Sequence, residues 1–72
     1  MGSLADLRRF ARKHGVLLRN TDHEFYLITH PLTGEELILK VSHGQGEIPP
    51  NLWKRILRQQ LKLSQEEFNR YI

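Results

Sequence analysis

The sequence predicts an α+β domain of two layers, in which helices pack against one face of a three-stranded antiparallel meander. Apolar residues recur near both ends of the chain at the helical period of about 3.6. In the middle they alternate at the period of a strand, in runs separated by short turns that join antiparallel neighbours. We therefore expect one domain over residues 1–72, in the order α-β-β-β-α with a short α-helix at the end.

The first predicted helix runs from Ser3 to His14. Ser3 is suited to the N-cap position, and Asp6 stands three residues later where a capping-box partner belongs. Gly15 follows at the position that a C′ glycine usually takes. One arc of the helix is largely apolar: Leu4, Leu7, Phe10, Ala11 and His14. The opposite arc is basic: Arg8, Arg9, Arg12 and Lys13.

Three strands are predicted next, at Val16 to Arg19, Glu24 to His30 and Glu36 to Ser42. Residues 20–22 and 31–34 have the composition of turns. The middle strand alternates two sets of side chains, which indicates that both faces are partly covered: Phe25, Leu27 and Thr29 against Tyr26, Ile28 and His30. The third strand places three apolar side chains on one face: Leu37, Leu39 and Val41.

A second helix is predicted from Pro50 to about Leu63, because proline is favoured at the first helical position. One broad arc of this helix is largely apolar: Leu52, Trp53, Ile56, Leu57, Gln60, Leu61 and Leu63. Its other arc is basic: Lys54, Arg55, Arg58 and Lys62. The run from Ser64 to Glu67 is a capping box that predicts a last short helix.

Size and composition favour a small domain that is stabilised either by idealised packing or by a partner protein. A chain of 72 residues has a marginal core, and it has no cysteine for disulfides. The lack of cysteine fits a cytoplasmic location. No apolar run approaches the roughly 20 residues of a membrane span, so we expect no membrane association.

The net charge of +3 permits nucleic-acid binding, and its distribution is more informative than its sum. Eight of the eleven lysines and arginines lie on the two basic arcs, whereas the acidic residues mostly avoid them. These arcs are consistent with a phosphate-binding surface, and equally with solvated faces that keep a small domain dispersed.

His23 is the candidate for chemistry, because it stands at the head of the aromatic strand and imidazole exchanges protons near neutral pH. His14 and His30 are interpreted as structural, and His43 ends the third strand, where site residues are common. The spacing of His23, His30 and His43 does not favour a metal site. No phosphate-binding loop motif is present, so we expect neither a metal nor a cofactor.

The order of short motifs from Leu4 to Phe68 resembles that of HicA, the toxin component of HicAB toxin–antitoxin systems. The N-terminal half carries a basic-x-Gly turn, a histidine entering an aromatic strand, a His-Pro pair and a strand ending in His: Lys13-His14-Gly15, Thr21-Asp22-His23-Glu24-Phe25-Tyr26, His30-Pro31 and Val41-Ser42-His43. The C-terminal half is the stronger match: Glu47-Ile48-Pro49-Pro50, Ile56-Leu57-Arg58 and Leu63-Ser64-Gln65-Glu66-Glu67-Phe68.

The resemblance implies a fold similar to a double-stranded-RNA-binding domain and an mRNA interferase, a metal-independent endoribonuclease. His23 aligns with the catalytic histidine of the family, and a HicB-like antitoxin would neutralise the enzyme. We expect the RNA backbone to be held by five cationic residues: Arg8, Arg12, Lys40, Lys54 and Arg58.

This chain departs from the family around its histidine. The family has Gly-Ser before the histidine and a second His after it, whereas Asp22 precedes His23 here and Glu24 follows it. Carboxylates on both sides would repel an incoming phosphate. The alternative is therefore a non-catalytic RNA-binding module of the same fold, and a third reading is a small interaction protein with solvated basic arcs.

Overall fold

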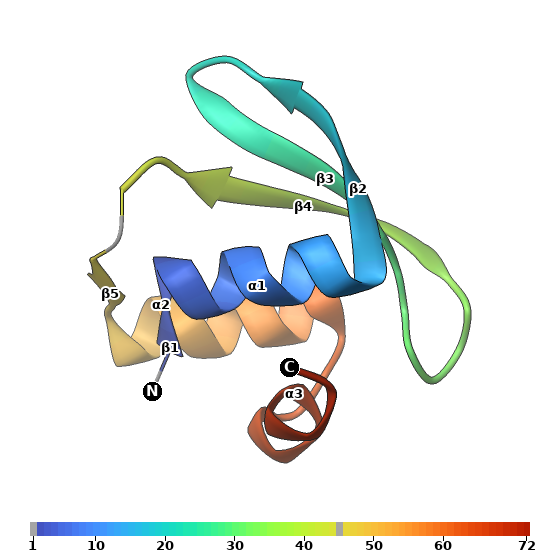
Figure 1. Cartoon of the computed structure of the whole chain (residues 1–72). Coiled ribbons are helices and arrows are strands. Elements are labelled where there is room, and N and C mark those ends of the chain that lie inside the picture. Colours follow the sequence, from blue (N-terminus) through green and yellow to red (C-terminus); the bar gives the residue numbers. More distant parts are fainter. Residues whose placement is uncertain (1, 45) are drawn as a thin grey trace.

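The computed structural model describes residues 2–44 and 46–72, and it confirms the α+β class with a three-stranded antiparallel sheet (Figure 1). The elements follow one another as β1 (Gly2–Ser3), α1 (Leu4–His14), β2 (Gly15–Asn20), β3 (His23–Thr29), β4 (Glu36–Ser42), β5 (Glu47–Ile48), α2 (Pro50–Arg55), the π-helix η1 (Ile56–Leu61) and α3 (Gln65–Tyr71). Helices α1 and α2–η1 lie side by side under the sheet, with α3 beneath them (Figure 1).

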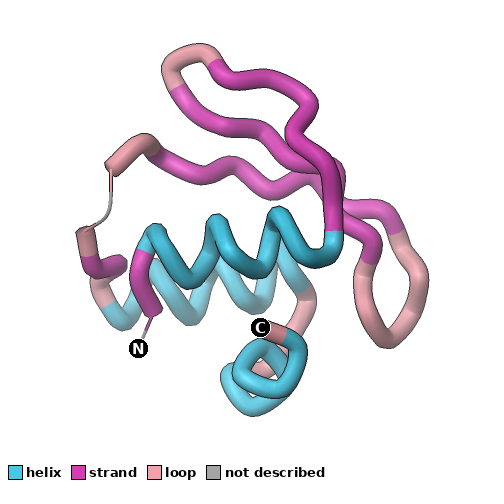
Figure 2. The backbone as a smooth tube through the Cα atoms, viewed as in Figure 1, coloured by secondary structure: helices cyan, strands magenta, loops and turns pink. Residues whose placement is uncertain are grey.

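The sheet has the strand order β2-β3-β4, and the helices lie on one side of it (Figure 2). The burial of residues along β3 and β4 shows that the two faces of the sheet differ in exposure. The helix face carries Tyr26, which pairs in register with Leu17 and with the fully buried Leu39. The opposite side, called the open face here, carries Leu27 and Ile38 in one cross-strand row, and 54% of Ile38 is exposed. Because side chains alternate along a strand, every second residue of β3 belongs to the open face.

The hydrophobic core lies between the helix face of the sheet and the helices. Phe10 of α1 is fully buried and stacks on Phe68 of α3 with ring centroids 5.2 Å apart. The Trp53 ring meets Phe68 edge-on at 5.0 Å, so one aromatic cluster joins all three helical segments. The sequence therefore anticipated the layer of helices on one face of the meander.

Helix α1 begins as expected but ends for a different reason. The Ser3 hydroxyl accepts a hydrogen bond from the Asp6 amide at 3.1 Å, which confirms the N-cap. Gly15 is not a left-handed C′ glycine, because its φ of −160° is extended and it already belongs to β2. A Cβ at this position would lie 2.2 Å from the Leu27 carbonyl oxygen. Glycine is needed here for close approach to β3.

The second predicted helix is interrupted. Helix α2 ends at Arg55 and continues as the wider π-helix η1, which stops at Leu61 rather than at about Leu63. Lys62 then adopts a left-handed conformation with φ of 53°, and the amides of Lys62 and Leu63 both donate to the Leu57 carbonyl. This turn sets the direction of α3.

Helix α3 confirms the predicted capping box. Ser64 Oγ accepts from the Glu67 amide at 3.1 Å, and Glu67 Oε1 accepts from the Ser64 amide at 2.9 Å. The capping box therefore gives partners to two of the amides that lack a hydrogen bond within the helix, those of Ser64 and Glu67.

One pairing was not predicted. The two-residue strands β1 and β5 pair antiparallel, with Gly2 opposite Ile48, and Gly2 lies so close to Trp53 that a Cβ would be 2.4 Å from the indole ring. Runs of two residues carry no periodicity that a sequence could reveal. Across the part of the chain that the structure describes, no helix has both the length and the apolar character needed to cross a membrane.

Candidate functional site

His23 opens β3 on the open face of the sheet. It pairs in register with Ser42 of β4, and its side chain is 29% exposed. The Phe25 ring, two residues later on the same face, meets the His23 ring edge-on at a centroid distance of 6.4 Å. The imidazole is therefore partly enclosed but reachable from the solvent side of the sheet.

Asp22 is the nearest carboxylate to the His23 ring. Its Oδ2 lies 3.4 Å from His23 Nδ1, an ion-pair separation that does not satisfy hydrogen-bond geometry, and Nδ1 has no other partner in residues 2–44 and 46–72. The Thr21 hydroxyl donates to Asp22 Oδ1 at 3.0 Å and is the main cause that lowers the pKa of Asp22. A modest rotation of the exposed Asp22 side chain would let it orient Nδ1–H, which would leave Nε2 to exchange a proton.

Glu24 follows His23 but faces the helices. Its carboxylate accepts hydrogen bonds from the Tyr26 hydroxyl and, at 3.3 Å, from Arg8 Nε, and it lies 3.7 Å from His43 Nδ1. The hydrogen bond from Tyr26 is the largest cause that lowers the pKa of Glu24, and the charge of Arg8 acts in the same direction. The negative charge of Glu24 is thus balanced by Arg8 within the fold, on the sheet face opposite His23.

A row of cation, aromatic ring and cation crosses the open face beside His23. Phe25 pairs with Arg19 on one side and with Lys40 on the other. The Arg19 guanidinium carbon lies 4.6 Å from the centroid of the Phe25 ring, in cation–π contact. No sequence motif marks Arg19 or Phe25 as a site residue, although the alternation of β3 places Phe25 on the same face as His23.

The five cationic residues predicted to hold RNA do not form one surface. Lys40 lies on the open face in the row with Phe25. Arg8 is committed to the fold, because it also donates to the backbone carbonyls of Ser42 at 3.2 Å and Gly44 at 2.9 Å. These contacts tie α1 to the end of β4 and leave Arg8 few donors for a ligand.

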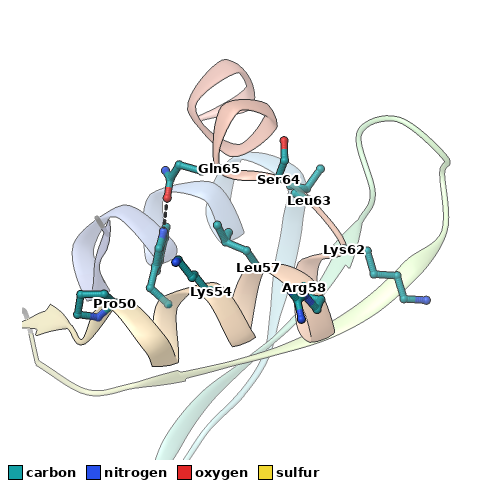
Figure 3. Close-up of a pocket in the computed structure, with 9 residues that line it drawn as sticks. Pro50, Lys54, Leu57, Arg58, Lys62, Leu63, Ser64 and Gln65 are labelled. Atoms are coloured by element: carbon teal, nitrogen blue, oxygen red, sulfur yellow. Dashed lines mark hydrogen bonds between the residues drawn. The ribbon is translucent and has the colours of Figure 1, made fainter.

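The other three cations belong to hollows on the helix side. Arg12 lines a hollow of about 190 Å³ together with Tyr26 and Glu24. Burial is the main cause that raises the pKa of Tyr26, and its hydrogen bond to Glu24 adds to the effect, so the phenol remains a donor. Lys54 and Arg58 line a groove between α2–η1 and the start of α3 (Figure 3).

The remaining histidines make contacts within the fold. His30 is 4% exposed, its Nδ1 accepts from the amides of Leu32 and Thr33, and its Nε2 therefore donates to the Lys62 carbonyl at 3.0 Å. His14 Nε2 bonds the Tyr71 carbonyl at 2.7 Å. Within residues 2–44 and 46–72, no three histidine, aspartate or glutamate side chains come together as a metal site would require.

Comparison of the chain with protein-family models, with curated proteins and with solved structures found no match in any of the three. The geometry of the open face is therefore the basis for the functional argument.

Proposed function

We propose that this chain is a HicA-like RNA-cleaving toxin, a metal-independent endoribonuclease of the mRNA interferase type with His23 as its catalytic residue. The observation that carries the proposal is the open face, where His23 lies beside Phe25 and the basic residues that flank it. In this account the fold belongs with the double-stranded-RNA-binding-domain-like folds, to which the order of elements is similar.

The open face has the parts that a single RNA strand requires. An aromatic ring or a guanidinium plane gives a base a surface for stacking, and beside His23 the Arg19 guanidinium lies over the Phe25 ring. Arg19 and Lys40 flank that ring and supply positive charge for the phosphates on either side of the base. An RNA strand that crosses the open face at the start of β3 passes over the His23 imidazole.

The reaction follows from the position of His23. Nε2 of the neutral ring takes the proton of a ribose 2′-OH, and the 2′ oxygen attacks the adjacent phosphorus. The bond from phosphorus to the 5′ oxygen breaks, which leaves a 2′,3′-cyclic phosphate on one product. The 5′ oxygen of the other product takes a proton from the protonated ring or from water, and Lys40 would balance charge that develops on the phosphate.

The carboxylates beside His23 oppose this reaction less than their sequence positions suggest. Glu24 faces the helices and is paired with Arg8, so it does not present charge to the open face. Asp22 is close to Nδ1 and can steady the ring during proton transfer. This arrangement supports turnover by a histidine that carries acidic neighbours.

A HicB-like antitoxin in the cytoplasm would neutralise the toxin by covering the open face. The edge strand β2 supports this part of the proposal, because three consecutive apolar residues of it are about half exposed: Val16, Leu17 and Leu18 at 59%, 50% and 54%. An edge strand with exposed apolar side chains is a site at which a partner chain can add.

A non-catalytic RNA-binding module of the same fold is the second candidate. The unsatisfied Nδ1 of His23 favours it, because a general base normally has its second nitrogen held by a partner. In that case the Phe25 row would bind RNA without cleavage.

Analysis of the RNA products separates the two candidates. A short single-stranded RNA is incubated with the purified protein in the presence of a metal chelator. The ends of any RNA fragments are then identified by mass spectrometry. The proposal predicts fragments that carry a 2′,3′-cyclic phosphate, and it predicts no cleavage of the same oligonucleotide made with 2′-deoxyribose throughout. Cleavage of the deoxy oligonucleotide would contradict the mechanism, and binding without cleavage would favour the non-catalytic module.

A further inference from the structure

We propose that the groove between α2–η1 and α3 docks an acidic, amphipathic helix of a partner protein, at a site separate from the open face. The groove encloses about 650 Å³, within the size range of sites that take apolar groups. This proposal does not depend on ribonuclease activity, because the groove lies on the helix side of the fold (Figure 3).

The left-handed turn at Lys62 creates the groove. Because the chain changes direction there, the start of α3 lies across the groove from α2–η1. The Trp53 indole nitrogen donates a hydrogen bond to Gln65 Oε1, and this bond links the start of α3 to α2. The two walls of the groove are therefore linked by the chain at residues 62–64 and by this hydrogen bond.

The groove combines an apolar interior with basic walls. Pro50, Trp53, Leu57 and Leu63 contribute its apolar lining, whereas Lys54 and Arg58 contribute charge. Among the described residues, no aspartate or glutamate lines the groove. Figure 3 shows Lys54 and Leu57 pointing from α2–η1 toward α3. A ligand that fits both features carries apolar side chains beside carboxylates.

Lys54 and Arg58 are available to such a ligand. Across residues 2–44 and 46–72, neither side chain lies at ion-pair distance from a carboxylate, whereas Lys62 is paired with Glu35 at 2.8 Å. Lys54 and Arg58 are four residues apart on one helical segment, so their charges follow the groove. Carboxylates spaced one helical turn apart on a partner helix would match them.

An RNA strand fits this groove less well than a helix does. Phosphates would find the two cations, but no base-stacking ring is offered, because the buried Trp53 ring is 2% exposed and is engaged edge-on by Phe68. Leucine side chains of an amphipathic helix, in contrast, can enter the apolar interior between the cations. The occupant is therefore assigned as protein.

The test uses a designed peptide and the single tryptophan of the chain as a reporter. The peptide is a helical 16-mer with leucine along one face and glutamate beside it, and its matched control replaces each glutamate by glutamine. Binding is followed by Trp53 fluorescence and by the amide spectrum of labelled protein. We expect changes at the Trp53 indole N–H and at the Leu57 and Leu63 amides, and weaker binding of the glutamine peptide.

Charge-reversal variants separate groove binding from general attraction. Lys54→Glu and Arg58→Glu should each lower the affinity for the acidic peptide by about fivefold or more. Arg9→Glu changes the net charge equally at an exposed position on α1 and should change affinity by less than about twofold. All three substitutions are at exposed helical residues, so folding is checked by comparing their amide spectra with that of wild type.

Three results would overturn the proposal. The first is no binding of the acidic peptide, and the second is an equal loss of affinity in Arg9→Glu. The third is perturbation of the amides of β2, β3 and β4 in place of those of the groove. Perturbation of the groove by single-stranded RNA, but not by the peptide, would assign the site to nucleic acid.

Discussion

His23 and Glu24 are adjacent in the chain, yet their side chains face opposite sides of the sheet. Glu24 reaches Arg8 and Tyr26 on the helix face, whereas His23 lies next to Phe25 on the open face. One carboxylate is thus used to join α1 to the sheet, and the imidazole remains accessible.

Replacement of Glu24 by glutamine should destabilise the fold by about 1–2 kcal/mol, because charge-assisted hydrogen bonds from Arg8 and Tyr26 are weakened. The Glu24 side chain is 12% exposed, so solvent screens these interactions only in part. Urea denaturation measures the loss. Glu36→Gln, at an exposed position on β4, should change the free energy of unfolding by less than about 0.5 kcal/mol.

The contribution of Glu24 should also depend on pH. The pKa of Glu24 is lowered in the folded state, so the unfolded chain binds the proton more readily. The free energy of unfolding therefore falls as the pH is lowered. The contribution is complete above the unfolded carboxylate pKa of about 4.3 and is lost as pH falls through the lower folded value. The stability difference between wild type and Glu24→Gln should therefore shrink below about pH 4. A difference that stays constant down to pH 2 would contradict this role.

Gly15→Ala should destabilise the protein by about 2–4 kcal/mol, because a Cβ would lie 2.2 Å from the Leu27 carbonyl oxygen and β2 would have to move. The matched control is Gly46→Ala, since a Cβ at Gly46 meets no atom within 4 Å. Thermal melts of the two variants give the comparison. Equal melting temperatures would show that β2 does not require the close approach.

His30→Ala should cost about 2–3 kcal/mol. The substitution removes the acceptor of the Leu32 and Thr33 amides and the donor to the Lys62 carbonyl, in a residue that is nearly fully buried. His43→Ala, at an exposed residue, serves as the control and should cost less. Denaturant titration of both variants checks the order, and a larger loss in His43→Ala would contradict it.

Lys40 and Arg58 should differ in RNA binding, because the structure places Lys40 beside Phe25 and Arg58 in the groove. Lys40→Ala should weaken the binding of a single-stranded RNA oligonucleotide. It should also reduce the steepness of the slope of log affinity against log salt by about one. Arg58→Ala should leave that slope unchanged. Fluorescence anisotropy at several salt concentrations measures both variants, and a lower slope for Arg58→Ala alone would move the RNA site to the helix side.

The elements with strong local signals were predictable from the sequence. The bounds of β4, the Ser3 cap and the capping box of α3 agree with the structure. The β1–β5 pair was not predictable, because it depends on a contact between distant segments. The π-helix was not predictable either, because the apolar pattern of residues 56–61 does not distinguish it from a continuation of α2. Helical periodicity assigns the cations to arcs of a helix. It does not reveal that Arg8 forms hydrogen bonds with Glu24 and with the end of β4.

The candidate site was half accessible to sequence reasoning. His23 could be singled out, but its companions come from strands on either side, and only the register brings Arg19, Phe25 and Lys40 into one row. Alternation in β3 already separates His23 from Glu24. The sequence alone does not say which of those two faces the helices cover.

The most direct measurement is cleavage of a single-stranded RNA by the purified chain with metal chelated, compared between wild type and His23→Ala. Asn substitution of the exposed Asp22 is measured alongside, as a test of whether that carboxylate orients the ring. We expect cleavage by wild type and none by His23→Ala, with amide spectra showing that both proteins are folded and both bind RNA. Equal cleavage by the two proteins would contradict the role of His23.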